Sequence, residues 1–204
     1  MGIRRAAQAT RALIEAASPQ LLVSVGIAGA VNADLEIGDV VASRINCLFE
    51  DGIAGPFKPL ARLSEAAWQV AEKALQSGGA GLYPGTAVTT HGAQPVQHLL
   101  EHMENPVLEM ETAGIMSAAA EKSIPVLSLR AISDGPRAPI PFNLEQMMDE
   151  QENLRTGAII QTILSHPRML PQLVRMGRNS RLAADNAALA LLAVLSQSGP
   201  IINP

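Results

Sequence analysis

Helix-like and strand-like segments alternate along residues 4–134, and this order leaves few folds open to the chain. Amphipathic or alanine-rich segments predict helices, and β-branched runs that end at glycine or an acidic residue predict buried strands. The alternation is typical of an α/β domain with a mixed, mostly parallel sheet flanked by helices. Helices are predicted at 4–16, 63–79, 95–103 and 113–122, and strands at 20–31, 35–52 (two strands joined at 38–39), 81–94, 106–112 and 124–134.

The composition supports one domain of this class. Aromatic residues make up only 2% of the 204 residues, so the core is built from Ala, Val, Ile, Leu and Met. We predict a single domain, 1–204, with a core at 1–164 and a C-terminal helical extension at 165–204. The lone Cys47 excludes an intramolecular disulfide, and together with the absence of a signal-peptide pattern it favours a cytoplasmic protein.

Charge and histidine spacing narrow the ligand classes. The formal net charge of −4 gives no overall electrostatic footprint for binding nucleic acid. The four histidines lack the spacing of a metal site, so no metal is expected. The two-glycine turn at 26–29 lacks the full dinucleotide fingerprint, which argues against NAD binding.

Three acidic residues stand where buried strands end. The segment "VLEMETAG" carries Glu109 and Glu111, and "LSLRAISDG" carries Asp134. Burying a carboxylate is costly, so acids at strand ends call for a reason. In open α/β sheets ligands bind at the carboxyl ends of the strands, where we expect Glu111, Asp134, Gly26 and His91 to meet.

Three blocks together resemble a known family. The segments "MGIRRAAQAT", "SVGIAGAVNADLEIGDVV" and "LEMETAGIMSAAAEKSIPVLSLRAISD" are similar to the purine nucleoside phosphorylase and methylthioadenosine/S-adenosylhomocysteine nucleosidase superfamily. The Glu-Met-Glu block followed by Arg-Ala-Ile-Ser-Asp is the specific part. The tail "HPRMLPQLVRMGRNSRLAADNAALALLAVL" is similar to that of the hopanoid-associated branch, which is thought to remove adenine from adenosylhopane.

The resemblance implies a three-layer phosphorylase-like fold and a role for each matched residue. Asp134 would be the general acid that protonates purine N7, and Ser133 would orient it. Glu111 would accept hydrogen bonds from the ribose hydroxyls and support the cationic sugar, against which Met110 would pack. The chemistry is consistent with a protonated acid and an ionised acid acting together. The remaining substrate-binding candidates are Glu109, Gly29, His91 and Phe142.

Each assignment has a plainer alternative. Asp134 precedes Gly135 and Pro136 and could simply initiate a turn. Glu111 could cap the following helix, and Glu109 could be a structural or rim residue. His91 could be a solvent-facing loop residue, and Gly26 and Gly29 could simply form a turn of the backbone.

The sequence departs from the family in three places. The family's opening strands, which carry the hydrolases' general base and the phosphorylases' anion-binding residues, have no counterpart, so we expect the printed sequence to begin inside a longer gene product. Ile27 stands where many relatives place Ser or Thr, which favours water over phosphate as the nucleophile. Ala93 stands where nucleosidases often place an aromatic residue for purine stacking.

Two segments after Asp134 have open roles. Residues 136–150 include Phe142 and could cover the ribose 5′ substituent or dock a helix on the core. The leucines and arginines of the tail could contact a membrane surface, or cover the core or a dimer partner.

The sequence therefore predicts an enzyme that cleaves the N-glycosidic bond of a purine nucleoside as a homo-oligomer, with a dimer favoured. No cofactor is expected, with phosphate as an optional co-substrate. The alternatives are a nucleoside phosphorylase, for example one acting on adenosylhopane, and a catalytically silent purine-binding relative.

Overall fold

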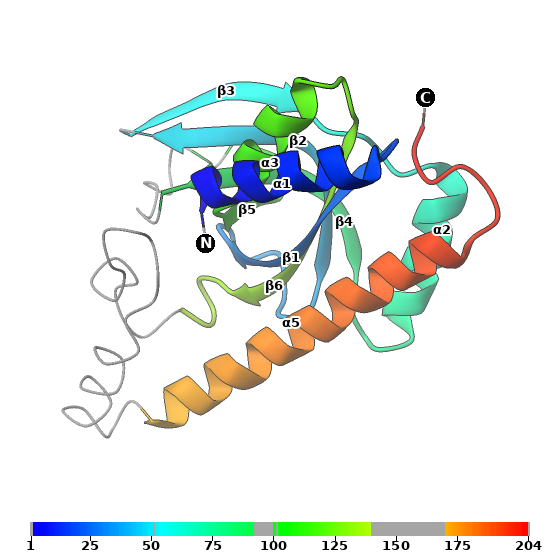
Figure 1. The fold of residues 1–204 in the computed structure, drawn as a ribbon. Helices are drawn as coiled ribbons and strands as arrows, with labels where there is room; N and C mark the ends of the chain where they lie inside the picture. The colour runs from blue at the N-terminus through cyan, green and yellow to red at the C-terminus, as the bar shows by residue number, and fades with distance from the viewer. Residues whose placement is uncertain (1, 51, 92–99, 101, 140–169, 204) are drawn as a thin grey trace.

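The computed structural model describes residues 2–50, 52–91, 100, 102–139 and 170–203 (Figure 1). Six strands and four helices are found there, and the order along the chain confirms the expected alternation, except that the strand Ile53–Pro59 was not predicted. The elements are α1 (Ile3–Ala17), β1 (Leu22–Ala30), β2 (Val40–Glu50), β3 (Ile53–Pro59), α2 (Glu65–Gln76), β4 (Leu82–Thr90), β5 (Pro106–Glu109), α3 (Thr112–Ala120), β6 (Val126–Asp134) and α5 (Leu170–Ser196).

The six strands form one mixed sheet that closes on itself. Their order is β3-β2-β4-β5-β1-β6, and β2 also pairs with β6, so five of the strands form a ring. The two longest pairings, β1 with β6 and β2 with β4, are parallel. The pairings of β1 with β5, β2 with β3 and β2 with β6 are antiparallel. The predicted mixed sheet is confirmed, but it is closed rather than open.

One strand prediction is wrong in its detail. Residues 35–52 hold a single strand, β2, because residues 35–39 form a turn in front of it. The Asp39 carboxylate fixes this turn by accepting hydrogen bonds from the backbone N–H of Glu36 and of Gly81, each over 2.8 Å. The side chain therefore holds the turn against the start of β4. Most of the helix expected at 95–103 lies outside the described residues.

Helices cover the sheet in two groups (Figure 1). Helix α1 packs on α3, which lies against the sheet, and Ile14 of α1 shares a core cluster with Leu22 and Val126 of the strands. On the other side, α2 and α5 pack together against β6. Ser64 caps α2, as predicted, and its hydroxyl accepts from the Ala67 N–H over 3.2 Å.

The C-terminal extension contributes to this second group. Ala183, Ala187, Ala190 and Val194 of α5 join the core cluster that contains Leu127 and Leu129 of β6. Within the described part of the chain, none of the helices combines the length and apolar character that crossing a bilayer requires.

Candidate active site

Glu109, at the carboxyl end of β5, is a buried carboxylate that caps α3. Its Oε2 accepts from the backbone N–H groups of Glu111 and Thr112, over 3.0 and 2.7 Å, and from the Thr112 hydroxyl over 2.7 Å. Its Oε1 accepts from the hydroxyl of Thr89 on β4. The residue is only 5% exposed. Its hydrogen-bonding capacity is used within the protein, which favours the structural interpretation of Glu109.

Arg130 of β6 is the counter-ion of this carboxylate. Its Nη2 donates to Glu109 Oε2 over 3.0 Å, to Ser24 Oγ over 2.7 Å and to Thr112 Oγ1 over 3.0 Å. Its register partner on β1 is Gly26, where an added Cβ would lie 3.1 Å from the guanidinium. A small residue at position 26 therefore leaves room for the arginine, which accounts for the first glycine of the turn.

The pKa values of Glu109 and Glu111 are shifted in opposite directions. Burial favours the neutral form of Glu109, but Arg130 and the hydrogen bonds from Thr89 and Thr112 outweigh it and hold its pKa below the ordinary value. Burial, and then the charge of Glu109, raise the pKa of Glu111. Two acids two residues apart thus differ in protonation behaviour.

Glu111 occupies the N-cap position of α3 without capping it. Its side chain makes no hydrogen bond to the first turn of the helix. Instead its Oε2 accepts from the backbone N–H of Met110 over 3.3 Å. Because Glu109 takes over the capping of α3, the carboxylate of Glu111 is available for a ligand. Met110 beside it is partly buried.

Asp134 ends β6 and is held by its neighbour. The hydroxyl of Ser133 donates to Asp134 Oδ1 over 2.6 Å and lies 3.3 Å from the carbonyl oxygen of Ala28. Burial raises the pKa of Asp134, and the hydrogen bond from Ser133 opposes this only in part. The backbone of the turn that follows closes on itself between Gly135 and Ala138. Asp134 thus lies at the start of this turn as a half-buried carboxyl held by Ser133.

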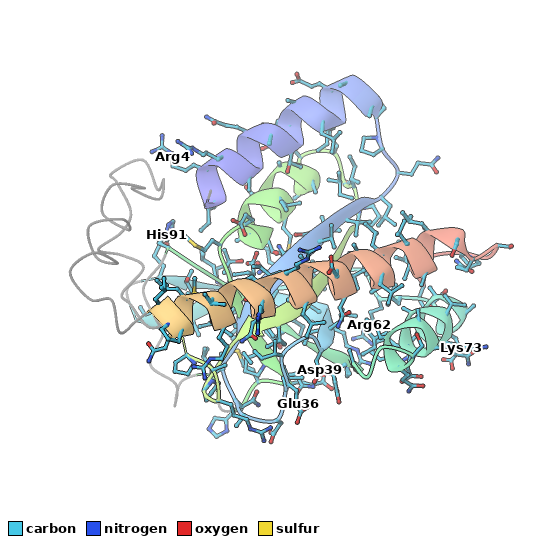
Figure 2. The ribbon with its side chains drawn as sticks, turned by 90° about the horizontal axis from the view of Figure 1, so that it is seen from below. Arg4, Glu36, Asp39, Arg62, Lys73 and His91 are labelled. Carbon is cyan, nitrogen blue, oxygen red and sulfur yellow. The ribbon has the colours of Figure 1, made fainter. Side chains whose placement is uncertain are left out.

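The carboxyl of Asp134 borders a cavity and crowds Gly29. An added Cβ on Gly29 would lie 2.7 Å from Asp134 Oδ2, so position 29 must be glycine for the acid to keep its place. The cavity, of about 330 Å³, is apolar apart from Asp134, Glu36 and Arg137. Glu36 and Arg137 form an exposed ion pair of 3.4 Å, and Figure 2 shows Glu36 on the outer side of the turn.

Strand register places the segment that carries Glu109 and Glu111 relative to Asp134. Gly29 of β1 pairs with Leu108 of β5 on one side and with Asp134 of β6 on the other. Because neighbouring strands lie about 4.8 Å apart, the backbones of Leu108 and Asp134 are separated by about 10 Å. The expectation that Glu111 and Asp134 end strands of the same direction is wrong, since β5 runs opposite to β6. Both strands nevertheless pair with Gly29, from opposite sides of β1.

The other predicted residues lie apart from these groups or outside the described residues. His91 follows β4, where its Nε2 lies 3.3 Å from Glu50 Oε1. The cavity beside Asp134 does not include His91 or Glu111 among its described lining residues. Phe142 lies outside the described residues, as does the loop position Ala93.

Sequence reasoning missed the small polar residues that position the acids. Ser24 and Thr89 bind Arg130 and Glu109, yet they belong to strands whose pattern is otherwise apolar. The available signal was that hydroxyl groups inside buried strands need partners. Among the described residues, no group of three or more His, Cys, Asp or Glu side chains is arranged to hold a metal ion.

A closed mixed sheet covered by helices, with carboxylates on the strands that flank β1, defines the chain as an α/β protein. Within that class the chain belongs to the phosphorylase superfamily, whose family model matches residues 1–165.

Individual relatives agree with this family. The chain is 25% identical over 172 residues to the 5′-methylthioadenosine/S-adenosylhomocysteine nucleosidase of Haemophilus influenzae, covering 78% of this chain and 75% of the relative. The fold resembles that of the corresponding nucleosidase from Colwellia psychrerythraea in complex with adenine, with a TM-score of 0.65 and 19% identity, covering 100% of this chain and 78% of the other. Futalosine hydrolase of Helicobacter pylori gives a TM-score of 0.56 and 18% identity, covering 94% and 76%.

The comparisons confirm the predicted superfamily and the phosphorylase-like fold. They also confirm the prediction of an enzyme that acts on nucleosides. The resemblance of the tail to the hopanoid-associated branch stays a prediction, as do the domain boundaries at 164 and 165.

Proposed function

We propose that the chain cleaves the N-glycosidic bond of an adenine-type nucleoside, with Asp134 as the general acid and Glu111 as the acceptor for the ribose hydroxyls. One observation carries the proposal: Asp134 is a half-buried carboxyl with a raised pKa that is hydrogen-bonded to Ser133 and borders a cavity. A carboxyl with a raised pKa keeps its proton closer to neutral pH and can donate it to a leaving group.

The reaction balances with these groups. The bond between ribose C1′ and purine N9 breaks, and its electron pair leaves with the base. Asp134 gives its proton to N7, so the purine departs neutral, and an oxygen nucleophile bonds to C1′. When water attacks, the product is the free sugar, and the proton that the water gives up restores the acid form of Asp134. Protonation of the base lowers the barrier because the ring no longer has to carry away a negative charge.

Glu111 would stabilise the sugar while it carries positive charge. Its carboxylate accepts from the Met110 N–H on one oxygen and is not engaged in capping α3. An anion placed beside a developing oxocarbenium ion lowers its free energy, as carboxylates do in glycosidases. Met110 would pack against the ribose. Protonation of the base and stabilisation of the sugar supply the chemistry, so we propose that no metal or organic cofactor is needed.

The choice of an adenine-type nucleoside rests on relatives. The Haemophilus influenzae relative is named for two adenine nucleosides, methylthioadenosine and S-adenosylhomocysteine, and one solved structure contains adenine. We favour hydrolysis over phosphorolysis because Ile27, on β1, has no group that could bind phosphate. The second candidate is phosphorolysis of a nucleoside such as adenosylhopane, which the similarity of the tail favours.

Incubation with methylthioadenosine, S-adenosylhomocysteine and adenosine, with and without phosphate, tests the proposal through release of free adenine. Adenine released without phosphate supports the nucleosidase, and adenine released only with phosphate supports the phosphorylase. If the chain binds adenine without releasing it from any nucleoside, it is a silent purine-binding relative and the proposal fails.

A further inference from the structure

Asn46 is a buried asparagine in the middle of β2. Only 2% of its surface is exposed, and burying an amide is costly unless its hydrogen bonds are made. Its Nδ2 donates to the carbonyl oxygen of Ala87 over 3.1 Å and to Thr89 Oγ1 over 2.8 Å. Because a backbone carbonyl can only accept, the amide must turn its NH₂ group toward Ala87. Both hydrogens of that group are then used, one on Ala87 and one on Thr89.

The hydroxyl of Thr89 is left with one direction for its own proton. A hydroxyl can accept two hydrogen bonds and donate one. Thr89 Oγ1 accepts from Asn46 and, over 3.1 Å, from the backbone N–H of Ala113 in the first turn of α3. Its proton therefore goes to the remaining partner, Glu109 Oε1. Thr89 is fully buried, so bulk water does not compete for this proton.

The two oxygens of Glu109 are held by different groups. Thr89 donates to Oε1, whereas the other donors within the described part of the chain, which belong to Glu111, Thr112 and Arg130, all reach Oε2. Oε2 in turn holds the backbone N–H of Glu111 over 3.0 Å. The bond from Thr89 thus fixes the rotation of the carboxylate, and this rotation decides where Oε2 holds Glu111.

We propose that Asn46 is a positioning residue for the ribose end of the site: it directs the Thr89 proton onto Glu109, which holds the segment that carries Glu111. The inference rests on the proposed function, because it takes Glu111 as the acceptor for the ribose hydroxyls. The contacts run from β2 through β4 to β5, which are neighbours in the sheet. Asn46 acts through two other side chains and is not itself a catalytic residue.

Strand pairing alone does not account for this amide. Strands β2 and β4 already pair in parallel from Val40 to Phe49, so they need no side-chain bond between them. An apolar side chain of similar size would fill the position without the cost of burying an amide. The hydrogen bond from Asn46 to Thr89 is the feature that strand pairing leaves unexplained, and its effect is to orient a donor to Glu109.

Comparing a ligand that has a ribose with one that lacks it tests the proposal. Asn46→Ala and Thr89→Val should each raise the KM for methylthioadenosine about tenfold and leave the inhibition constant of free adenine within about twofold. Adenine has no ribose, so a displaced Glu111 does not weaken its binding. Thr89→Ser keeps the hydroxyl and should keep the KM. Asn203→Ala, which removes an amide that donates to the Leu63 carbonyl over 3.2 Å, is the control and should change neither constant.

The double variant Asn46→Ala/Thr89→Val separates a relay from two independent contributions. If Asn46 acts through Thr89, the double variant should raise the KM no more than Thr89→Val alone, whereas independent effects would multiply to about 100-fold. Asn46→Asp keeps the size of the side chain, removes the NH₂ group and should raise the KM as Asn46→Ala does, even if the alanine variant does not fold. Multiplied effects, equal loss of nucleoside and adenine affinity, or a wild-type KM in the Asn46 variants would each overturn the proposal.

Failure of the proposed function gives a different result. A wild type that binds methylthioadenosine without releasing adenine would sink the cleavage reaction. The same variants, compared through the dissociation constants of methylthioadenosine and adenine measured by calorimetry, would still decide the role of Asn46. A wild type that binds no nucleoside would overturn both proposals.

Discussion

Arg130 of β6 and Glu109 of β5 form an ion pair of 3.0 Å, with side chains only 4% and 1% exposed. The pair spans β1, since the strand order is β5-β1-β6. The Glu109 carboxylate also receives the first N–H groups of α3, so a single buried contact joins two strands to a helix. The position of Glu111 depends on this contact, because its own N–H donates to Glu109.

Glu109→Gln should strongly destabilise the fold. The amide keeps the size of the side chain but leaves the Arg130 guanidinium buried without a counter-charge, which typically costs about 3–5 kcal/mol. Denaturant unfolding measures this cost. Glu104→Gln, which breaks the exposed 3.6 Å pair with Arg44, is the matched control and should cost less than about 1 kcal/mol. Equal effects of the two substitutions would contradict the buried role of Glu109.

The same pair should make stability depend on acid pH. The folded state lowers the pKa of Glu109 from its ordinary value of 4.5. An acid with a depressed folded pKa contributes stability that is present above its unfolded pKa and is lost as pH falls through the folded value. The difference in unfolding free energy between wild type and Glu109→Gln should therefore be constant near neutral pH and shrink as pH falls below 4.5. A difference that is independent of pH down to complete acid unfolding would argue against ionisation of Glu109.

Local sequence patterns predicted the individual helices and strands better than they predicted how distant strands pair. The strand at 126–134 and the helix at 65–76 follow from apolar periodicity and a Ser64 cap, which are local signals. The direction of β5 against β6 and the closure of β2 on β6 depend on contacts between distant segments, which no local pattern encodes. The turn at Asp39 was mistaken for a strand junction because its partner, Gly81, is remote in the sequence.

In the candidate site, too, some residues could be predicted from the sequence and others could not. Asp134 and Glu111 could be located from the cost of burying acids and from the family resemblance. That Glu109 caps α3 could not be predicted. Glu109, three residues before Thr112, and Glu111, next to it, are equally plausible caps from the sequence alone. The buried Arg130 and the hydroxyl of Thr89 decide between them, by holding Glu109 inward.

Asp134→Asn should abolish most turnover with little loss of binding. An amide cannot deliver the proton, and general-acid catalysis is typically worth about 10²–10⁴-fold. In the wild type, turnover should fall as pH rises through the raised pKa of Asp134, because the acid then loses its proton. The variant should lack that decline, as measured by adenine release across pH. Asp34→Asn, at an exposed position, is the control; unchanged turnover in Asp134→Asn would refute the acid role.

Gly29→Ala tests whether the position of the acid matters apart from its chemistry. The glycine does not have a positive φ, so alanine is allowed by the backbone, and the obstacle is the 2.7 Å approach to Asp134 Oδ2. The new methyl group should push the carboxyl aside, and a displacement near 1 Å can cost about 10²-fold in rate. Adenine release should therefore fall while the far-ultraviolet circular dichroism spectrum is retained. Gly177→Ala is the matched control, because a Cβ there meets no atom within 4 Å and alanine should stabilise α5 by up to about 1 kcal/mol. If Gly29→Ala kept full turnover, the crowding of Asp134 by β1 would have no part in holding the acid, and the hydrogen bond from Ser133 would be left as its only support among the described contacts.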